Sequence, residues 1–319
     1  MHSCQKTYFR GVIRYYAMNK VKGYIYGCVS AATFGLIPLF SVPVMEKGIT
    51  VDNILCYRFC IAAAAIGLLS WVKKESLRVS FKELLLLVLL GAMYTGSAFF
   101  LFWGYGHMAT GIACTILYLY PVFVILLMAT FFHEKVTWIN LLAIFLAFCG
   151  VAMLYLGDGD QKMNLMGVII VLAAALCYAL YIVGVNKSVV QTMTGGKVSF
   201  YTLVTGAVMA LVKSCFGEGM QVLPDWSSVF NVVMLAIVPT VISCVTMVYS
   251  VRYVGSTTTS VLGAMEPVTA VVVGILVFSE PFTLNLVVGI LLIIIAVLLI
   301  ILSDLIRATL SRVFRSKVK

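Results

Sequence analysis

Ten runs of mostly apolar residues follow one another along the chain, separated by short polar gaps. Each run is about 20 residues long, the length that a helix needs to cross the hydrocarbon core of a bilayer. The pattern predicts an all-α, polytopic membrane protein with ten transmembrane helices. The predicted spans are 23–45, 53–72, 83–105, 109–132, 137–156, 163–186, 197–216, 227–250, 255–278 and 283–303.

The composition supports a membrane location. Hydrophobic types make up 62% of the chain, charged types make up only 11%, and the mean hydropathy is +1.09. Soluble domains contain about 25% charged residues, so this chain has too few charges to cover a soluble fold. A soluble enzyme and a disordered chain are excluded. The net charge of +10 does not predict a nucleic-acid partner, because most Lys and Arg residues lie in the gaps between apolar runs and form no stripe on one face.

The distribution of positive charge predicts how the chain is oriented. Eighteen of the 22 Lys and Arg residues fall on the side of the membrane that holds both termini, three fall on the other side, and Arg58 lies within a span. Cytoplasmic loops retain positive charge, so we expect an integral protein of the cytoplasmic membrane with both termini in the cytoplasm. Residues 1–22 and 304–319 are predicted basic cytoplasmic tails, of which 304–319 should lie on the inner membrane surface. Met18 looks like a natural start, so the residues before it are either a loose tail or not part of the protein.

A short motif occurs twice, once in each half of the chain. Tyr120-Pro121-Val122-Phe123 is followed by Glu134, thirteen residues beyond the proline, and Glu266-Pro267-Val268-Thr269 is followed by Glu280 at the same spacing. The repeat predicts two five-helix units, residues 23–156 and 163–303. Because five is an odd number, the second unit must run through the membrane inverted. Secondary transporters are built from inverted repeats that bind their substrate between the halves, near the midplane.

The chain resembles the EamA-type permeases of the drug/metabolite transporter superfamily. The residues that carry the resemblance are Arg58 with the run Ala62–Ala65, the doubled Pro-to-Glu motif, and the glycines Gly150 and Gly289. The resemblance covers nearly everything from residue 23 to residue 303. It implies alternating-access transport of a small molecule, often outward, but it does not name the substrate, the coupling ion or the oligomeric state.

Glu266 is the sharpest candidate for a substrate-binding residue. It lies about eleven residues into the ninth span, near the centre of the bilayer by helical rise. An acidic group there costs several kcal/mol unless it is paired, solvated or protonated, which makes it a functional candidate. We consider substrate binding and proton coupling, and as a structural alternative a protonated side chain that bonds to a neighbouring helix.

Arg58 lies inside the second span, about five residues from its external end. Its guanidinium group suits a carboxylate-bearing or otherwise anionic substrate, since it binds in bidentate geometry. The alternative is a structural role, either by extending to the interface or by pairing with Asp52 or Glu46.

Prolines and tyrosines complete the candidate site. Pro121 and Pro267 sit at matching depths, where each removes a backbone donor and predicts a hinge or a cavity wall, or else a kink that only shapes packing. Four mid-span tyrosines are further candidates for substrate binding, with core packing as the alternative: Tyr94, Tyr120, Tyr178 and Tyr181. A buried hydroxyl needs a partner, so some of these should face a central cavity.

A membrane-embedded enzyme is the competing class of function. His133-Glu134 begins a metalloprotease-like motif, but Thr137 stands where the second histidine ligand belongs. The cysteines form no CxxC pair. We therefore expect no metal, no cofactor and no catalytic residue, and we favour a transporter.

Overall fold

The computed structural model describes residues 21–133, 138–156, 164–217, 219–254, 265–279 and 283–296, with short pieces at 259, 262–263 and 298–299. These residues are helical with connecting turns and contain no strand, as predicted. Most of both predicted tails, together with Glu134 and Glu280 of the repeated motif, lies outside the described residues.

Seven helices in the described part of the chain are long and apolar enough to cross a membrane. They are Val21–Met45, Val51–Val72, Phe81–Tyr105, Thr110–Phe132, Leu165–Val185, Gly195–Phe216 and Trp226–Met247. Three shorter apolar helices, Leu141–Gly150, Met265–Phe278 and Leu284–Ala296, coincide with the remaining predicted spans. The multi-pass helical architecture is thus observed, while the count of ten spans stays a prediction.

Several spans consist of more than one helix. In chain order the elements are a helix over 21–34, α2 (Ile37–Met45), α3 (Val51–Val72), α4 (Phe81–Tyr105), α5 (Thr110–Leu117), α6 (Tyr120–Phe132), α7 (Trp138–Leu156), α8 (Leu165–Lys187), η1 (Val189–Thr192), α9 (Gly195–Phe216), α10 (Trp226–Ala236), η2 (Ile237–Ile242), α11 (Ser243–Val254), α13 (Met265–Phe278) and the helix Leu284–Ala296.

Polar residues at the helix starts explain where several elements begin. Ser80 and Glu83 form a reciprocal capping box at α4, and the side chains of Asn164, Thr194 and Asp225 accept bonds from the first turns of α8, α9 and α10. Such caps satisfy backbone N–H groups that have no partner within the helix. They lie in the gaps between apolar runs, so the same polar residues end the spans and start the helices.

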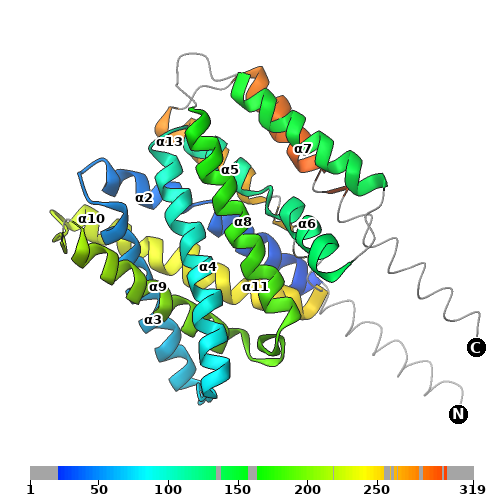
Figure 1. The fold of residues 1–319 in the computed structure, drawn as a ribbon. Helices are drawn as coiled ribbons and strands as arrows, with labels where there is room; N and C mark the ends of the chain where they lie inside the picture. Colours follow the sequence, from blue (N-terminus) through cyan, green and yellow to red (C-terminus); the bar gives the residue numbers. More distant parts are fainter. Residues whose placement is uncertain are drawn as a thin grey trace, which may run out of the picture.

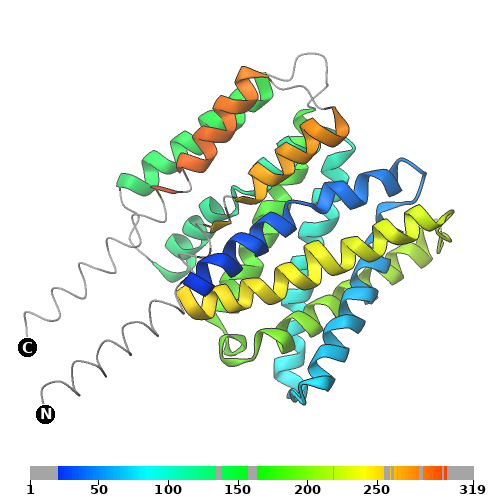
Figure 2. The same cartoon turned by 180° about the vertical axis from the view of Figure 1, so that it is seen from behind.

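The two predicted halves of the chain pack closely against each other (Figure 1). The most extensive helix contacts join α3 to α9 and α4 to both α8 and α9, and α5 packs on α13. Each of these contacts joins the first half to the second. At one side of the bundle α7 lies along the helix Leu284–Ala296 (Figure 2), and a side chain at Gly150 would collide with Ile293 of that helix.

Candidate functional site

Four predicted tyrosines form one continuous aromatic cluster inside the bundle. Tyr178 on α8 is its centre: its ring lies 4.8 Å from Tyr120, 6.4 Å from Tyr94 and 6.2 Å from Tyr181, measured between ring centroids. The rings of Tyr94 and Tyr181 are 5.3 Å apart. The structure therefore brings together residues from α4, α6 and α8 that belong to both halves of the chain. We call this group the tyrosine cluster.

Arg58 lies beside the tyrosine cluster and is almost completely buried, with 2% of its surface exposed. Its Nε donates a hydrogen bond to the Thr240 hydroxyl at 2.8 Å. The expected alternatives of an interfacial side chain or an ion pair with Asp52 are not observed, because Asp52 instead pairs with Lys213 at 2.8 Å. Within the described residues, no carboxylate forms an ion pair with Arg58.

Glu266 approaches the tyrosine cluster from the opposite half of the chain. It is 8% exposed and lies in the first turn of α13. Its carboxyl group is within electrostatic range of the hydroxyls of Tyr120 and Tyr178, while Tyr105 is within range of both Glu266 and Arg58. No Lys, Arg or His of the described chain forms an ion pair with Glu266.

Interrupted helices converge on these residues. The first span breaks at residues 35–36, the fourth at Tyr118 and Leu119, and the eighth contains the π-helix η2. Pro121 stands in the first turn of α6, directly after a break, and Pro267 occupies the third position of α13. Proline fits the first turn of a helix because the N–H that it lacks would have no partner there. Both prolines therefore lie in the first turn of a helix, and their role as hinge, cavity wall or packing kink stays a prediction.

Gly35 allows two of the interrupted spans to touch. A Cβ atom at this position would lie 2.5 Å from the carbonyl oxygen of Glu266, closer than real Cβ contacts occur. Only glycine therefore lets the turn at 35–36 rest on the start of α13. This contact places the backbone of Glu266 against the break in the first span.

Two cavities lie one above the other between α2, α4 and α5. The deeper one has a volume of about 20 Å³ and is lined by Arg58, Tyr94 and Tyr178, among others. That volume holds about one water molecule, so the site is nearly closed in this conformation. The outer one, which we call the vestibule, has a volume of about 560 Å³, within the range of about 300–1,000 Å³ that is typical of sites for small molecules.

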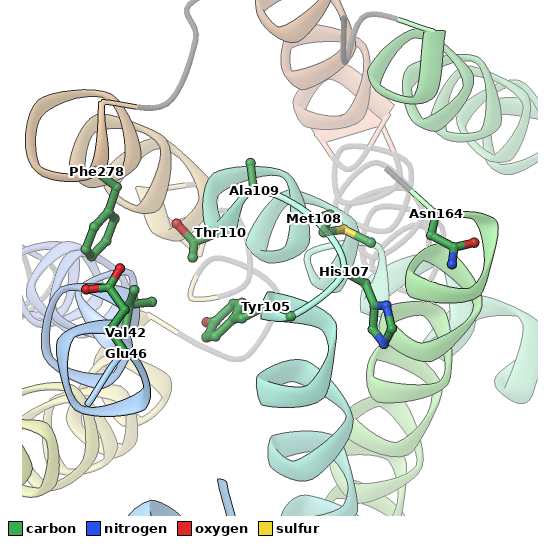
Figure 3. Close-up of a pocket in the computed structure, with 10 residues that line it drawn as sticks. Val42, Glu46, Tyr105, His107, Met108, Ala109, Thr110, Asn164 and Phe278 are labelled. Atoms are coloured by element: carbon green, nitrogen blue, oxygen red, sulfur yellow. The ribbon is translucent and has the colours of Figure 1, made fainter. Parts of the chain in front are cut away.

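The vestibule opens at one end of the bundle (Figure 3). Glu46 and Phe278 stand on one side of it, His107 and Asn164 on the other, and Tyr105 lies between them. Tyr105 is one helical turn beyond Leu101, which lines the deeper cavity. The two cavities therefore adjoin consecutive turns of α4.

Two residues of the site were missed by sequence reasoning. Thr240, the hydrogen-bond partner of Arg58, directly follows Pro239, and a third mid-span proline was the available signal. Tyr105 falls at the end of a predicted span, where aromatic residues commonly mark the membrane interface, so nothing local distinguished it from such a residue.

Comparison with known proteins gives the chain a family. The sequence matches the EamA-like transporter family twice, over residues 21–156 and 165–302, which confirms the predicted tandem repeat. A crystal structure with 18% sequence identity has a TM-score of 0.63 and covers 87% of this chain and 95% of the other. At this identity the likeness shows the fold alone.

Curated relatives of the chain are named as transporters. The uncharacterised transporter YdfC of Bacillus subtilis is 24% identical over 250 residues, which are 76% of this chain and 80% of the relative. A probable terminal-alkyne amino-acid exporter of Streptantibioticus cattleyicolor is 29% identical over 189 residues, 59% of this chain and 63% of the relative. The chain belongs to the EamA-like transporter family and is an integral, multi-pass membrane transporter.

Proposed function

We propose that the protein is a secondary transporter of the cytoplasmic membrane that moves a small solute carrying both an anionic and a cationic group, such as an amino acid. The observation that carries this proposal is the pair of buried charges. Arg58 on α3 and Glu266 on α13 are 2% and 8% exposed, and each lacks an ionic partner among the described residues.

The energetics of buried charge favour a solute with two charges. Removing a charged group from water without a partner costs several kcal/mol. A carboxylate can accept two parallel bonds from a guanidinium group, and an ammonium group can pair with Glu266 while it contacts the faces of tyrosine rings. A zwitterion would therefore compensate both buried charges at once. The relative named as an amino-acid exporter supports the same class of solute and an outward direction.

Alternating access is supported by the different volumes of the vestibule and of the cavity beneath it. The vestibule has room for a small solute, whereas the site beneath it holds about one water. Bonds between the halves occur at both ends: Lys47 pairs with Asp225 near the vestibule, and at the opposite end Lys197 and Tyr201 donate hydrogen bonds of 2.9 and 2.8 Å to the backbone before α4. Rocking of two inverted halves about the breaks near Pro121 and Pro267 would close the vestibule and open this end.

Proton coupling is assigned to Glu266. It is the one acidic side chain that is buried in the described part of the chain, and it can carry a proton when the solute is absent. With both termini in the cytoplasm, as the charge distribution predicts, the vestibule would open on the external side. The transporters among the relatives favour a protein without enzymatic activity.

Transport by reconstituted protein tests the proposal. Proteoliposomes are loaded with a mixture of the twenty standard amino acids, and efflux is followed by mass spectrometry with and without a pH gradient. We expect saturable efflux of at least one amino acid, its loss in Arg58→Gln, and loss of its response to the pH gradient in Glu266→Gln. Arg78→Gln is the matched control, because Arg78 is exposed in the segment before α4.

Two results would overturn the proposal. The first is wild-type protein that moves none of the amino acids. The second is efflux that is unchanged in both buried-charge variants, provided that their melting temperatures show folded protein. Unchanged efflux in Glu266→Gln alone, with the same pH response, would remove only the proton-coupling step.

A further inference from the structure

The π-helix in the eighth span is built around Pro239 and Thr240. Pro239 has no N–H, so the carbonyl of Leu235, four residues earlier, loses its ordinary helical donor. The Thr240 hydroxyl replaces that donor with a hydrogen bond of 2.9 Å to the Leu235 carbonyl. Thr240 is completely buried, so water cannot satisfy the carbonyl in its place. The Pro-Thr pair thus repairs the interruption that the proline creates.

The same hydroxyl holds Arg58. A threonine hydroxyl has one proton to donate and two lone pairs to accept with. Since the proton goes to Leu235, the lone pairs are left for the Arg58 Nε–H, which lies 2.8 Å away. Two hydrogen bonds in series therefore connect the guanidinium group to the backbone of the eighth span, with the direction of each bond set by the other.

The guanidinium group is fixed on its faces as well as on its Nε edge. Its central carbon lies 5.6 Å from the ring centroid of Phe59 and 5.9 Å from that of Phe102. Thr240 uses only the Nε–H, so four N–H donors on the two terminal nitrogens remain. In the part of the chain that the structure describes, these donors have no hydrogen-bond acceptor. Arg58 also lines the deeper cavity, together with Tyr94 and Tyr178.

We infer that Thr240 is a positioning residue for the anionic half of the site: it occupies the Nε edge of Arg58 and leaves the two terminal nitrogens to bind a carboxylate end-on. This inference rests on the proposed function and identifies how the site recognises one part of its solute. A valine of nearly the same shape would remove the hydroxyl bond to the Leu235 carbonyl and leave the Arg58 Nε–H without its acceptor, whereas a serine would keep both bonds.

Ligand-dependent melting of the purified protein in detergent tests the inference. The probes are 3-phenylpropionate, which has a carboxylate and no amine, and phenethylamine, which has an amine and no carboxylate. A ligand that binds the folded state raises the melting temperature by mass action. We expect 3-phenylpropionate to stabilise wild-type protein but not Arg58→Gln. Its apparent affinity should fall about 10-fold in Thr240→Val, the value of one hydrogen bond to a charged group, and recover in Thr240→Ser.

Two controls separate positioning from general damage to the fold. Thr246→Val removes a hydroxyl that bonds only to the carbonyls of Ile242 and Ser243 in its own helix, and it should bind 3-phenylpropionate as wild-type does. Phenethylamine should bind equally to wild-type and Thr240→Val. If Thr240→Val does not fold, Pro239→Ala tests the same turn by restoring the N–H that bonds to Leu235, and it should also weaken carboxylate binding.

The inference is overturned by wild-type protein that 3-phenylpropionate does not stabilise, by equal carboxylate affinity in wild-type and Thr240→Val, or by equal weakening of both probes. These outcomes differ from failure of the proposed function. Protein that binds 3-phenylpropionate through Arg58 and Thr240 but moves no amino acid would overturn amino-acid transport and leave the positioning role in place.

Discussion

Replacing Gly35 with alanine should destabilise the protein, because the added methyl group has no room. Its Cβ would lie 2.5 Å from the carbonyl oxygen of Glu266, 2.8 Å from the Cβ of Thr269 and 3.3 Å from the backbone nitrogen of Ala270. Two of these three atoms belong to the backbone. They can give way only if the start of α13 moves, and that movement would displace Glu266 from the tyrosine cluster.

The expected size of the effect follows from two opposing contributions. Forcing an extra carbon into a packed site costs about 1–3 kcal/mol. Alanine lowers the entropy of the unfolded chain relative to glycine, which offsets about 0.4–1 kcal/mol. The net loss is about 1–2 kcal/mol, and at about 2–4 °C per kcal/mol for a protein of this size the melting temperature should fall by about 2–8 °C.

Gly96 provides the matched control for this prediction. It lies within α4, and a Cβ at this position would meet only the Cys177 sulfur, at an ordinary contact distance of 3.8 Å. Gly96→Ala should leave the melting temperature unchanged or raise it, because alanine favours a helix over glycine by about 1 kcal/mol. Thermal unfolding in detergent, followed by circular dichroism, compares the two variants. Equal melting temperatures would refute the steric argument at Gly35.

Three further predictions concern the buried side chain of Asn53, the stability of the protein at low pH and the proline of the π-helix. Asn53→Leu should cost about 2–4 kcal/mol in thermal unfolding, because the buried Asn53 side chain bonds to several groups of α9 and of the segment that follows it. The bond from Lys47 lowers the pKa of Asp225 to about 2. The contribution of this ion pair to the free energy of unfolding is therefore present at neutral pH and is lost as the pH falls from about 4 towards 2. In Asp225→Asn the melting temperature should fall less steeply over this pH range. Pro239→Ala should raise the melting temperature while it weakens carboxylate binding, since a new N–H can bond to the Leu235 carbonyl.

The depth of polar residues in the spans was the most informative property of the sequence. Helical rise alone placed Glu266 near mid-span, and the structure buries it, as it buries Tyr120, another residue selected for its depth. The doubled motif likewise predicted a tandem repeat, which the two family matches confirm. Depth could be read from the sequence because a position along a transmembrane helix translates directly into a height in the membrane.

Relations between distant segments could not be predicted in this way. The bond between Arg58 and Thr240 joins residues that are 182 positions apart, and the role of Gly35 depends on the backbone of α13. The sequence allowed an ion pair between Asp52 and Arg58, yet Asp52 pairs with Lys213 of α9 instead. Each of these outcomes depends on which faces of two helices meet, and hydropathy contains no information about that pairing.

The shared location of the interrupted helices and the buried charges has a physical consequence. Backbone groups without helical partners and charges without counter-ions are both costly inside a bilayer, and a bundle that served only as a scaffold would be more stable with continuous helices and neutral side chains. Here both kinds of cost fall at one place, between the two halves of the chain. The most stable conformation is then the one in which these backbone groups and charges find partners. A bound zwitterion supplies two of them, at Arg58 and Glu266, so its arrival should favour closure of the halves around it.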